Sequence, residues 1–250
     1  MIQHSRIRQT LSLLALAAPV ALTGCIQREA PLPTPVPPRA APVLSSAGAE
    51  DQGAYQINRS VTVGGVGASQ GIFAEGDFIY ILGDLYENAG VEEGPGVIRE
   101  FFRSTGDDGR PTLRASGRQI LLTENGSDIA PHPTGLTWHP NFGYWLGSTV
   151  DQRGTLFQID FRRALRQGNL DGCVLHEVDD DAAINGTRPM FLTLPGGRVT
   201  LATSDYGDQS NTLRLYDPLA LLAADRTSTT GVIFSEAPCG PFVQSLASRG

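Results

Sequence analysis

The stretch GLTWHPNFGYWLGS, residues 135–148, decides the fold. Two short apolar runs, rich in residues that favour β-strands, flank a turn at His139-Pro140-Asn141. This pattern predicts an antiparallel hairpin. GIFAEGDFIYILGD (71–84) and MFLTLPGGRVTLATS (190–204) have the same arrangement around a short turn. The sequence therefore predicts three equivalent hairpins.

We expect a polar loop and a third strand after each hairpin. In the second and third repeats this strand is nearly the same, GTLFQIDFRRAL (154–165) and NTLRLYDPLALL (211–222), and each stretch ends in a short helix-like run. The repeating unit is about 55 to 64 residues long, and we expect three or four antiparallel strands in it. The expected fold class is all-β, with two short helices at most.

This pattern is similar to that of a β-propeller blade. The strand followed by a short helical turn resembles bacterial propellers of the NHL-like and gluconolactonase-like kind, in strand pattern alone. The resemblance implies a propeller-like domain over residues 51–250 with about four blades. The stretch CGPFVQSLA (239–247) would begin a fourth repeat, and YQINRSVTV (55–63) would complete the last blade. The alternative is an incomplete propeller, cut short after its third blade.

The N-terminus predicts export. Residues 1–24 begin with Arg6 and Arg8 and continue as an apolar run too short to span a bilayer. The motif Leu22-Thr23-Gly24-Cys25 resembles the bacterial lipobox, which implies a signal peptide over residues 1–24 and a lipid on Cys25. An ordinary secreted protein is the alternative. A lipid anchor would hold the protein at the cell membrane or the outer membrane, facing the periplasm or the cell surface.

Residues 25–50 predict a tether. Six of the chain's 17 prolines lie between Pro31 and Pro42, and a segment of this composition favours an extended spacer over a packed core. Removal of residues 1–24 leaves 17 arginines against 26 acidic residues, a net charge of −9. This charge argues against a nucleic-acid partner.

Cys173 and Cys239 form the predicted disulfide. Outside the cytoplasm two thiols in one domain pair readily, although free thiols are the alternative. Neither cysteine has a second ligand at the spacing of a zinc site.

Three polar residues are candidate ligand-binding residues. Gln70, His132 and Arg188 occupy equivalent positions before the first strand of each repeat. In a propeller such positions surround one mouth of the central channel, where they would bind a small anionic or polar ligand. A role in capping the loops is the alternative. His139 is interpreted as part of a turn.

Acidic residues give a candidate calcium site. Asp179, Asp180 and Asp181, with Asn185 nearby, offer the oxygen ligands that Ca²⁺ prefers, although a solvated acidic loop has the same composition. Ser69 in GASQG (67–71) matches the serine-hydrolase pattern G-x-S-x-G, but a strand hairpin follows it where that motif requires a helix.

The sequence therefore predicts a membrane-anchored, extracytoplasmic lipoprotein whose propeller-like domain binds or scaffolds a protein or a small polar ligand. It names no reaction. The first alternative is a propeller hydrolase or lactonase with a divalent metal at the channel mouth, near Gln70, His132, Arg188 and Asp205. The second is a fragment of a longer propeller.

Overall fold

The computed structural model describes residues 63–85, 94–150, 153–183, 185–209, 211–224, 229, 232–243 and 246. The predicted signal peptide, Cys25, the tether over residues 25–50 and residues 55–62 of the first predicted strand lie outside this part of the chain.

The described residues are mainly β-structure, which confirms the predicted fold class. The first sheet contains β1 (Gly67–Glu75), β2 (Phe78–Asp84), β3 (Gly96–Thr105) and β4 (Pro111–Leu121). The middle sheet contains β7 (His132–His139), β8 (Gly143–Val150), β9 (Arg153–Ile159) and β10 (Val174–Asp180). The last sheet contains β11 (Met190–Thr193), β12 (Val199–Ser204), β13 (Thr212–Tyr216) and β14 (Ile233–Pro238). A fourth sheet is the hairpin of β5 (Thr123–Glu124) and β6 (Ser127–Asp128).

Two short helices follow strands, as predicted. They are α1 (Phe161–Gln167) after β9 and α2 (Pro218–Leu222) after β13. Each begins after an aspartate whose carboxylate accepts a backbone hydrogen bond from the first turn, Asp160 for α1 and Asp217 for α2.

Each four-stranded sheet is an antiparallel meander in chain order. The hairpin turn between β11 and β12 shows why the sequence turns there. Gly196 and Gly197 have φ angles of 91° and 82°, in the left-handed region that glycine adopts without strain. The backbone N–H of Leu194 donates to the carbonyl of Arg198 and closes the turn.

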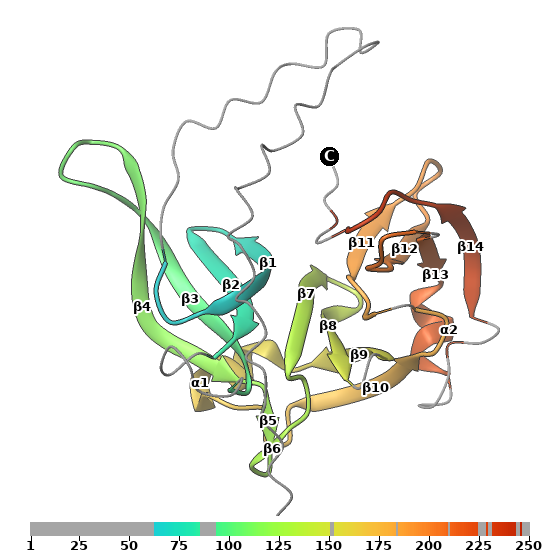
Figure 1. Ribbon diagram of the computed structural model, residues 1–250, viewed down its shortest axis with the longest axis horizontal. Helices are drawn as coiled ribbons and strands as arrows, with labels where there is room; N and C mark the ends of the chain where they lie inside the picture. Colours follow the sequence, from blue (N-terminus) through green and yellow to red (C-terminus); the bar gives the residue numbers. More distant parts are fainter. Residues whose placement is uncertain are drawn as a thin grey trace, which may run out of the picture. The chain divides into compact units, whose positions relative to one another are not determined.

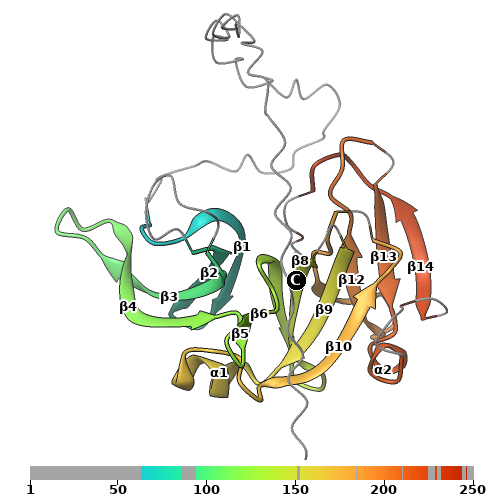
Figure 2. The same cartoon turned by 60° about the horizontal axis from the view of Figure 1, so that its bottom comes forward.

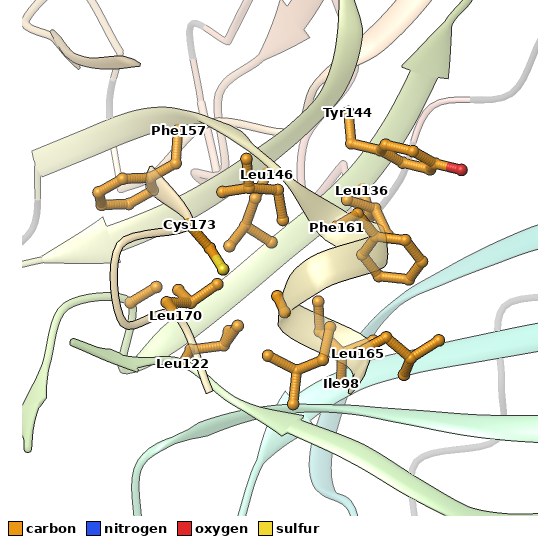
Figure 3. Close-up of a cluster of buried hydrophobic side chains, with 14 of the residues drawn as sticks. Ile98, Leu122, Leu136, Tyr144, Leu146, Phe157, Phe161, Leu165, Leu170 and Cys173 are labelled. Carbon is orange, nitrogen blue, oxygen red and sulfur yellow. The ribbon is translucent and has the colours of Figure 1, made fainter. Parts of the chain in front are cut away.

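The middle sheet lies between the other two (Figures 1 and 2). Leu146 and Phe157 of its strands share a hydrophobic core with Ile98 of the first sheet and with α1 (Figure 3). The neighbouring residues Trp145 and Leu156 belong to a second core shared with the last sheet and α2. Successive side chains of a strand point to opposite faces, so both faces of the middle sheet are covered.

The first strands of the three sheets lie side by side and run in the same direction. A Cβ atom added to Gly71 of β1 would lie 3.3 Å from the Cα atom of Gly135 in β7. One added to Gly135 would lie 3.3 Å from Cδ of Pro189, just before β11. The starts of β1, β7 and β11 therefore meet the ends of β2, β8 and β12 at one end of the sheets, which we call the strand-start end.

The structure shows an all-β fold of four antiparallel sheets, none of which closes on itself. It does not establish the predicted propeller. A new strand was expected near Cys239, but residues 239–243 form bends. The backbone N–H groups of Cys239 and Phe242 donate to Asn211 and Gly207 in the loop after β12.

The predicted disulfide is absent: Cys173 and Cys239 are both free thiols. Cys173 is fully buried in the core between the first and middle sheets (Figure 3). Cys239 follows β14 of the last sheet, which packs on the other face of the middle sheet. The two thiols therefore belong to different packing layers.

Candidate ligand-binding site

Polar residues are buried at the strand-start end. Asp84 ends β2, Ser148 lies near the end of β8, and Asp205 follows β12. Their exposed fractions are 2 %, 0 % and 0 %. Because buried polar groups cost free energy unless they are hydrogen-bonded, each requires partners close by.

Asp84 and His132 connect the first and middle sheets. The Oδ1 atom of Asp84 lies 3.2 Å from Nδ1 of His132. The Asp84 side chain is 3 % exposed and the His132 ring 36 % exposed. Ser148 donates to the backbone carbonyl of His132 at 3.2 Å, which fixes the start of β7. The pair is thus a buried carboxylate that orients a partly exposed imidazole.

Arg188 lies just before β11 and is 2 % exposed. Its guanidinium stacks over the Tyr206 ring at 4.7 Å and donates to the carbonyl of Asn185 at 3.3 Å. The Nε atom has no hydrogen-bond partner among the described residues. Burial lowers the pKa of Arg188 to about 10, against the opposing attraction of Tyr206 and Asp205.

The neighbouring acid, Asp205, is engaged by another arginine. Arg214 donates to its two carboxylate oxygens at 2.5 and 3.2 Å, and the backbone N–H of Thr212 donates at 2.9 Å. Both side chains of this ion pair are almost completely buried. The negative charge of Asp205 therefore mainly balances the positive charge of Arg214.

The predicted ring of Gln70, His132 and Arg188 is distributed over three sheets. All three residues lie at or near the strand-start end, with Gln70 half-buried inside β1. Within the described part of the chain, no hydrogen bond joins any two of them. His132 contacts the first sheet through Asp84, whereas Arg188 contacts the last sheet through Tyr206. Ligand binding by the three residues stays a prediction.

The aspartates of the predicted calcium site point in different directions. Asp180 is fully buried and accepts hydrogen bonds from Tyr216, Thr203 and Thr229 at 2.5, 3.3 and 3.1 Å. It therefore does not belong to a solvated loop. Burial raises the pKa of Asp180, and the hydrogen bonds from Tyr216 and Thr229 and the charge of Arg214 partly oppose the effect.

Asp181 and Asp179 have other neighbours. Asp181 accepts from the backbone N–H of Thr229 at 2.9 Å, and Asp179 lines a groove on the opposite face of β10. Within the described residues no group of three or more histidine, cysteine or acidic side chains is arranged to hold a metal ion. Calcium binding by these aspartates stays a prediction.

The groove beside Asp179 was not expected from the sequence. It has a volume of about 460 Å³ and lies between β9, β10 and the β5–β6 hairpin. Its lining contains Asp128, Ile129, Arg153, Thr155, Phe157, Glu177 and Asp179. Burial raises the pKa of Asp128. The residues come from segments up to about fifty positions apart, and no local pattern in the sequence links them.

Two sequence interpretations are confirmed. Ser69 is an exposed residue inside β1, so its G-x-S-x-G match lacks the strand-turn-helix geometry of a nucleophile. His139 belongs to the β7–β8 turn, where its Nδ1 atom accepts from the backbone N–H of Asn141 at 3.2 Å.

The sequence analysis missed Tyr206 as a neighbour of Arg188. Met190 pairs with Ala202 across β11 and β12, so the residues before β11 and those after β12 lie at the same end of the hairpin. The alignment of the hairpins contained this part of the signal, but it did not identify the residue that contacts Arg188.

No family model matches the chain, and no curated protein or solved structure matches it at a significant level. Among the described residues, no helix is both long and apolar enough to span a membrane.

Proposed function

We propose that this protein is a lipid-anchored, extracytoplasmic binding protein whose propeller-like β domain holds a small polar ligand at the strand-start end. The N-terminal pattern ending at Cys25 supports the anchor, and the proline-rich segment over residues 25–50 supports a spacer between membrane and domain.

The arrangement of the sheets supports the propeller-like part of the proposal. Three four-stranded meanders pack face to face, and their first strands run side by side in the same direction. Propeller blades have this organisation, although propellers usually contain four to eight of them. We therefore propose a propeller-like arrangement for the described sheets and no number of blades.

One observation carries the proposed binding role: each of the three sheets has a buried polar group at its strand-start end. Asp84, Ser148 and Asp205 are at most 2 % exposed, and Arg188, near Asp205, is 2 % exposed. A core that served stability alone would be apolar there, because buried charges contribute little stability even when they are paired. Such convergent polar groups are typical of ligand sites.

Membrane fractionation tests the anchor. The full chain is expected in the membrane fraction, with a lipid on Cys25 detectable by mass spectrometry. The Cys25→Ser variant is expected in the soluble extracytoplasmic fraction, whereas the matched Cys239→Ser variant stays with the membrane. An unmodified Cys25 in a membrane-free protein would contradict the proposal.

Thermal unfolding with added ligands tests the binding role. A ligand that binds only the folded chain raises the midpoint as its concentration rises. We expect at least one class within a panel of sugars, amino acids and small oxyanions to stabilise the soluble Cys25→Ser chain. If no class does so at millimolar concentration, the binding role is wrong.

A hydrolase is the second candidate, and the Asp84–His132 pair favours it. A buried carboxylate that orients an accessible imidazole is the arrangement of a general base that activates water. Hydrolysis of esters or lactones by the Cys25→Ser chain, with and without a divalent metal, tests it. Activity lost in His132→Gln and kept in His139→Gln would support this candidate, and no activity under either condition would exclude it.

A further inference from the structure

Among the described residues two arginines are buried, Arg188 and Arg214, and they differ in their partners. Four other arginines form ion pairs: Arg118 with Glu100, Arg162 with Glu75, Arg198 with Asp217 and Arg214 with Asp205. Arg188 is more buried than Arg214, yet it forms no ion pair within the part of the chain that the structure describes. Asp205 attracts the Arg188 guanidinium without forming an ion pair with it, and Arg214 already engages that carboxylate. An additional anion beside Arg188 would therefore be favourable.

The neighbours of Arg188 supply further hydrogen-bond capacity. Its Nε–H has no partner, and the hydroxyl of Ser204, which is fully buried, has none either. Ser204 ends β12, two residues before Tyr206, whose ring lies against the Arg188 guanidinium. Two unpaired donors beside a fixed positive charge match the lone pairs of an oxyanion.

Tyr206 fixes the plane of the guanidinium. The ring lies 4.7 Å from the Arg188 Cζ atom, and Phe242 packs edge-on against the same ring with the centroids 5.8 Å apart. A guanidinium held in one plane binds oxyanions bidentately without a large loss of side-chain entropy. The site is therefore preorganised before any ligand arrives.

We propose that Arg188 and Ser204 bind a small oxyanion, the carboxylate or phosphate group of a ligand. This inference rests on the proposed binding function and specifies the chemistry of its ligand. The guanidinium supplies two parallel N–H donors, and the Ser204 hydroxyl supplies a third. Water at this position would accept the same hydrogen bonds but would leave the charge uncompensated.

Urea unfolding of the Cys25→Ser chain in three sodium salts of equal ionic strength tests the proposal. Phosphate and acetate are the probes, and chloride is the reference. The midpoint is expected to rise with phosphate, with acetate or with both, and the more effective salt identifies the type of oxyanion. The fitted affinity is expected to fall at least tenfold in Arg188→Met and severalfold in Ser204→Ala.

Arg198→Met is the matched control. Arg198 also lies in the last sheet and stacks on an aromatic ring, Phe234 at 3.8 Å, but it has Asp217 as its carboxylate partner. Its replacement is expected to leave oxyanion binding unchanged. Because phosphate stabilises many proteins without binding to a site, only the difference between the two variants counts. If Arg188→Met does not fold, Arg188→Lys keeps the charge, and it is expected to weaken binding about tenfold because it loses the bidentate geometry.

The outcomes distinguish the oxyanion site at Arg188 from the proposed ligand-binding function in general. Equal responses of the parent chain and Arg188→Met to both salts would overturn the oxyanion site. If a sugar from the ligand panel still stabilised the chain, the binding function would stand without the oxyanion site. If no compound did, both proposals would be wrong.

Discussion

A single buried cation without a carboxylate partner should lower the stability of the ligand-free protein. Arg188→Met is expected to raise the free energy of unfolding by about 1 kcal/mol, because a hydrophobic side chain of similar length loses no hydration on burial. Urea unfolding at pH 7 in sodium chloride measures this difference. A loss of more than about 1 kcal/mol would show that the charge has a structural partner.

The difference in the free energy of unfolding between Arg188→Met and the parent chain is expected to depend on pH. Burial holds the pKa of Arg188 near 10 in the folded chain, below the ordinary value of an arginine, which the unfolded chain keeps. Between these two values the unfolded state binds more protons, so the contribution of Arg188 to stability rises with pH. The advantage of Arg188→Met over the parent chain is therefore expected to shrink as the pH rises above 10. A difference independent of pH up to 11 would contradict the assignment.

Asp180 should be a structural residue of the second core. Asp180→Ala is expected to lower the free energy of unfolding by about 2 kcal/mol, because it leaves the buried hydroxyl of Tyr216 without its acceptor. Its neighbour provides the control: Asp179→Ala changes a half-buried groove residue and is expected to stay within about 0.5 kcal/mol. Equal losses in chemical denaturation would contradict this account.

Several individual residues could be read from the sequence, and others could not. His139 and Ser69 were assigned correctly, because their roles depend on neighbours within a few positions. The roles of Asp179 and Asp180 could not be predicted, because adjacent residues of β10 point to opposite faces. Asp179 lines the groove, whereas Asp180 accepts a hydrogen bond from Tyr216 of another sheet. Contacts between sheets leave no local pattern.

At the scale of elements, the C-terminal end of α1 depends on a glycine. Gly168 has a φ angle of 85° and its N–H donates to the carbonyl of Ala164. Gly168→Ala is expected to destabilise the protein by about 1 kcal/mol, because a Cβ atom is unfavourable in the left-handed conformation. Gly240→Ala is the control, since open space surrounds it. Thermal melts in which both variants matched the parent chain would exclude a capping role.

The strands and helices were largely predictable, and the exception has a physical reason. The β5–β6 hairpin was missed because its two-residue strands are too short to show an alternating pattern. Its turn, Asn125-Gly126, has φ angles of 51° and 80°, and Asn-Gly is a strong hairpin signal. Attention to the turn dipeptide would have identified the hairpin that lines the groove.

At the scale of the whole molecule, the middle sheet should make unfolding cooperative. Leu146 belongs to the core shared with the first sheet and Leu156 to the core shared with the last. Leu146→Ala and Leu156→Ala are each expected to cost about 2–5 kcal/mol and to shift one common transition. Circular dichroism and tryptophan fluorescence should give coincident curves. Separate transitions for the two variants would show that the sheets fold independently.

The pattern of short strands and turns predicted the all-β class correctly. It did not determine whether the sheets close into a propeller or whether the two cysteines form a disulfide. Both depend on which faces of the sheets meet, and a strand pattern gives only the spacing along the chain. The cysteines illustrate the limit: each follows a predictable strand or turn, yet the middle sheet separates their layers.

The central claim is that an anionic group is held at Arg188. Native mass spectrometry of the purified Cys25→Ser chain tests it most directly, after exchange into a volatile buffer and addition of phosphate or, in a separate sample, acetate. We predict a one-to-one complex with at least one of the two anions that survives mild activation in the parent chain and in Arg198→Met and is absent in Arg188→Met. Equal occupancy in all three proteins would contradict the claim and would mean that the buried guanidinium binds no oxyanion.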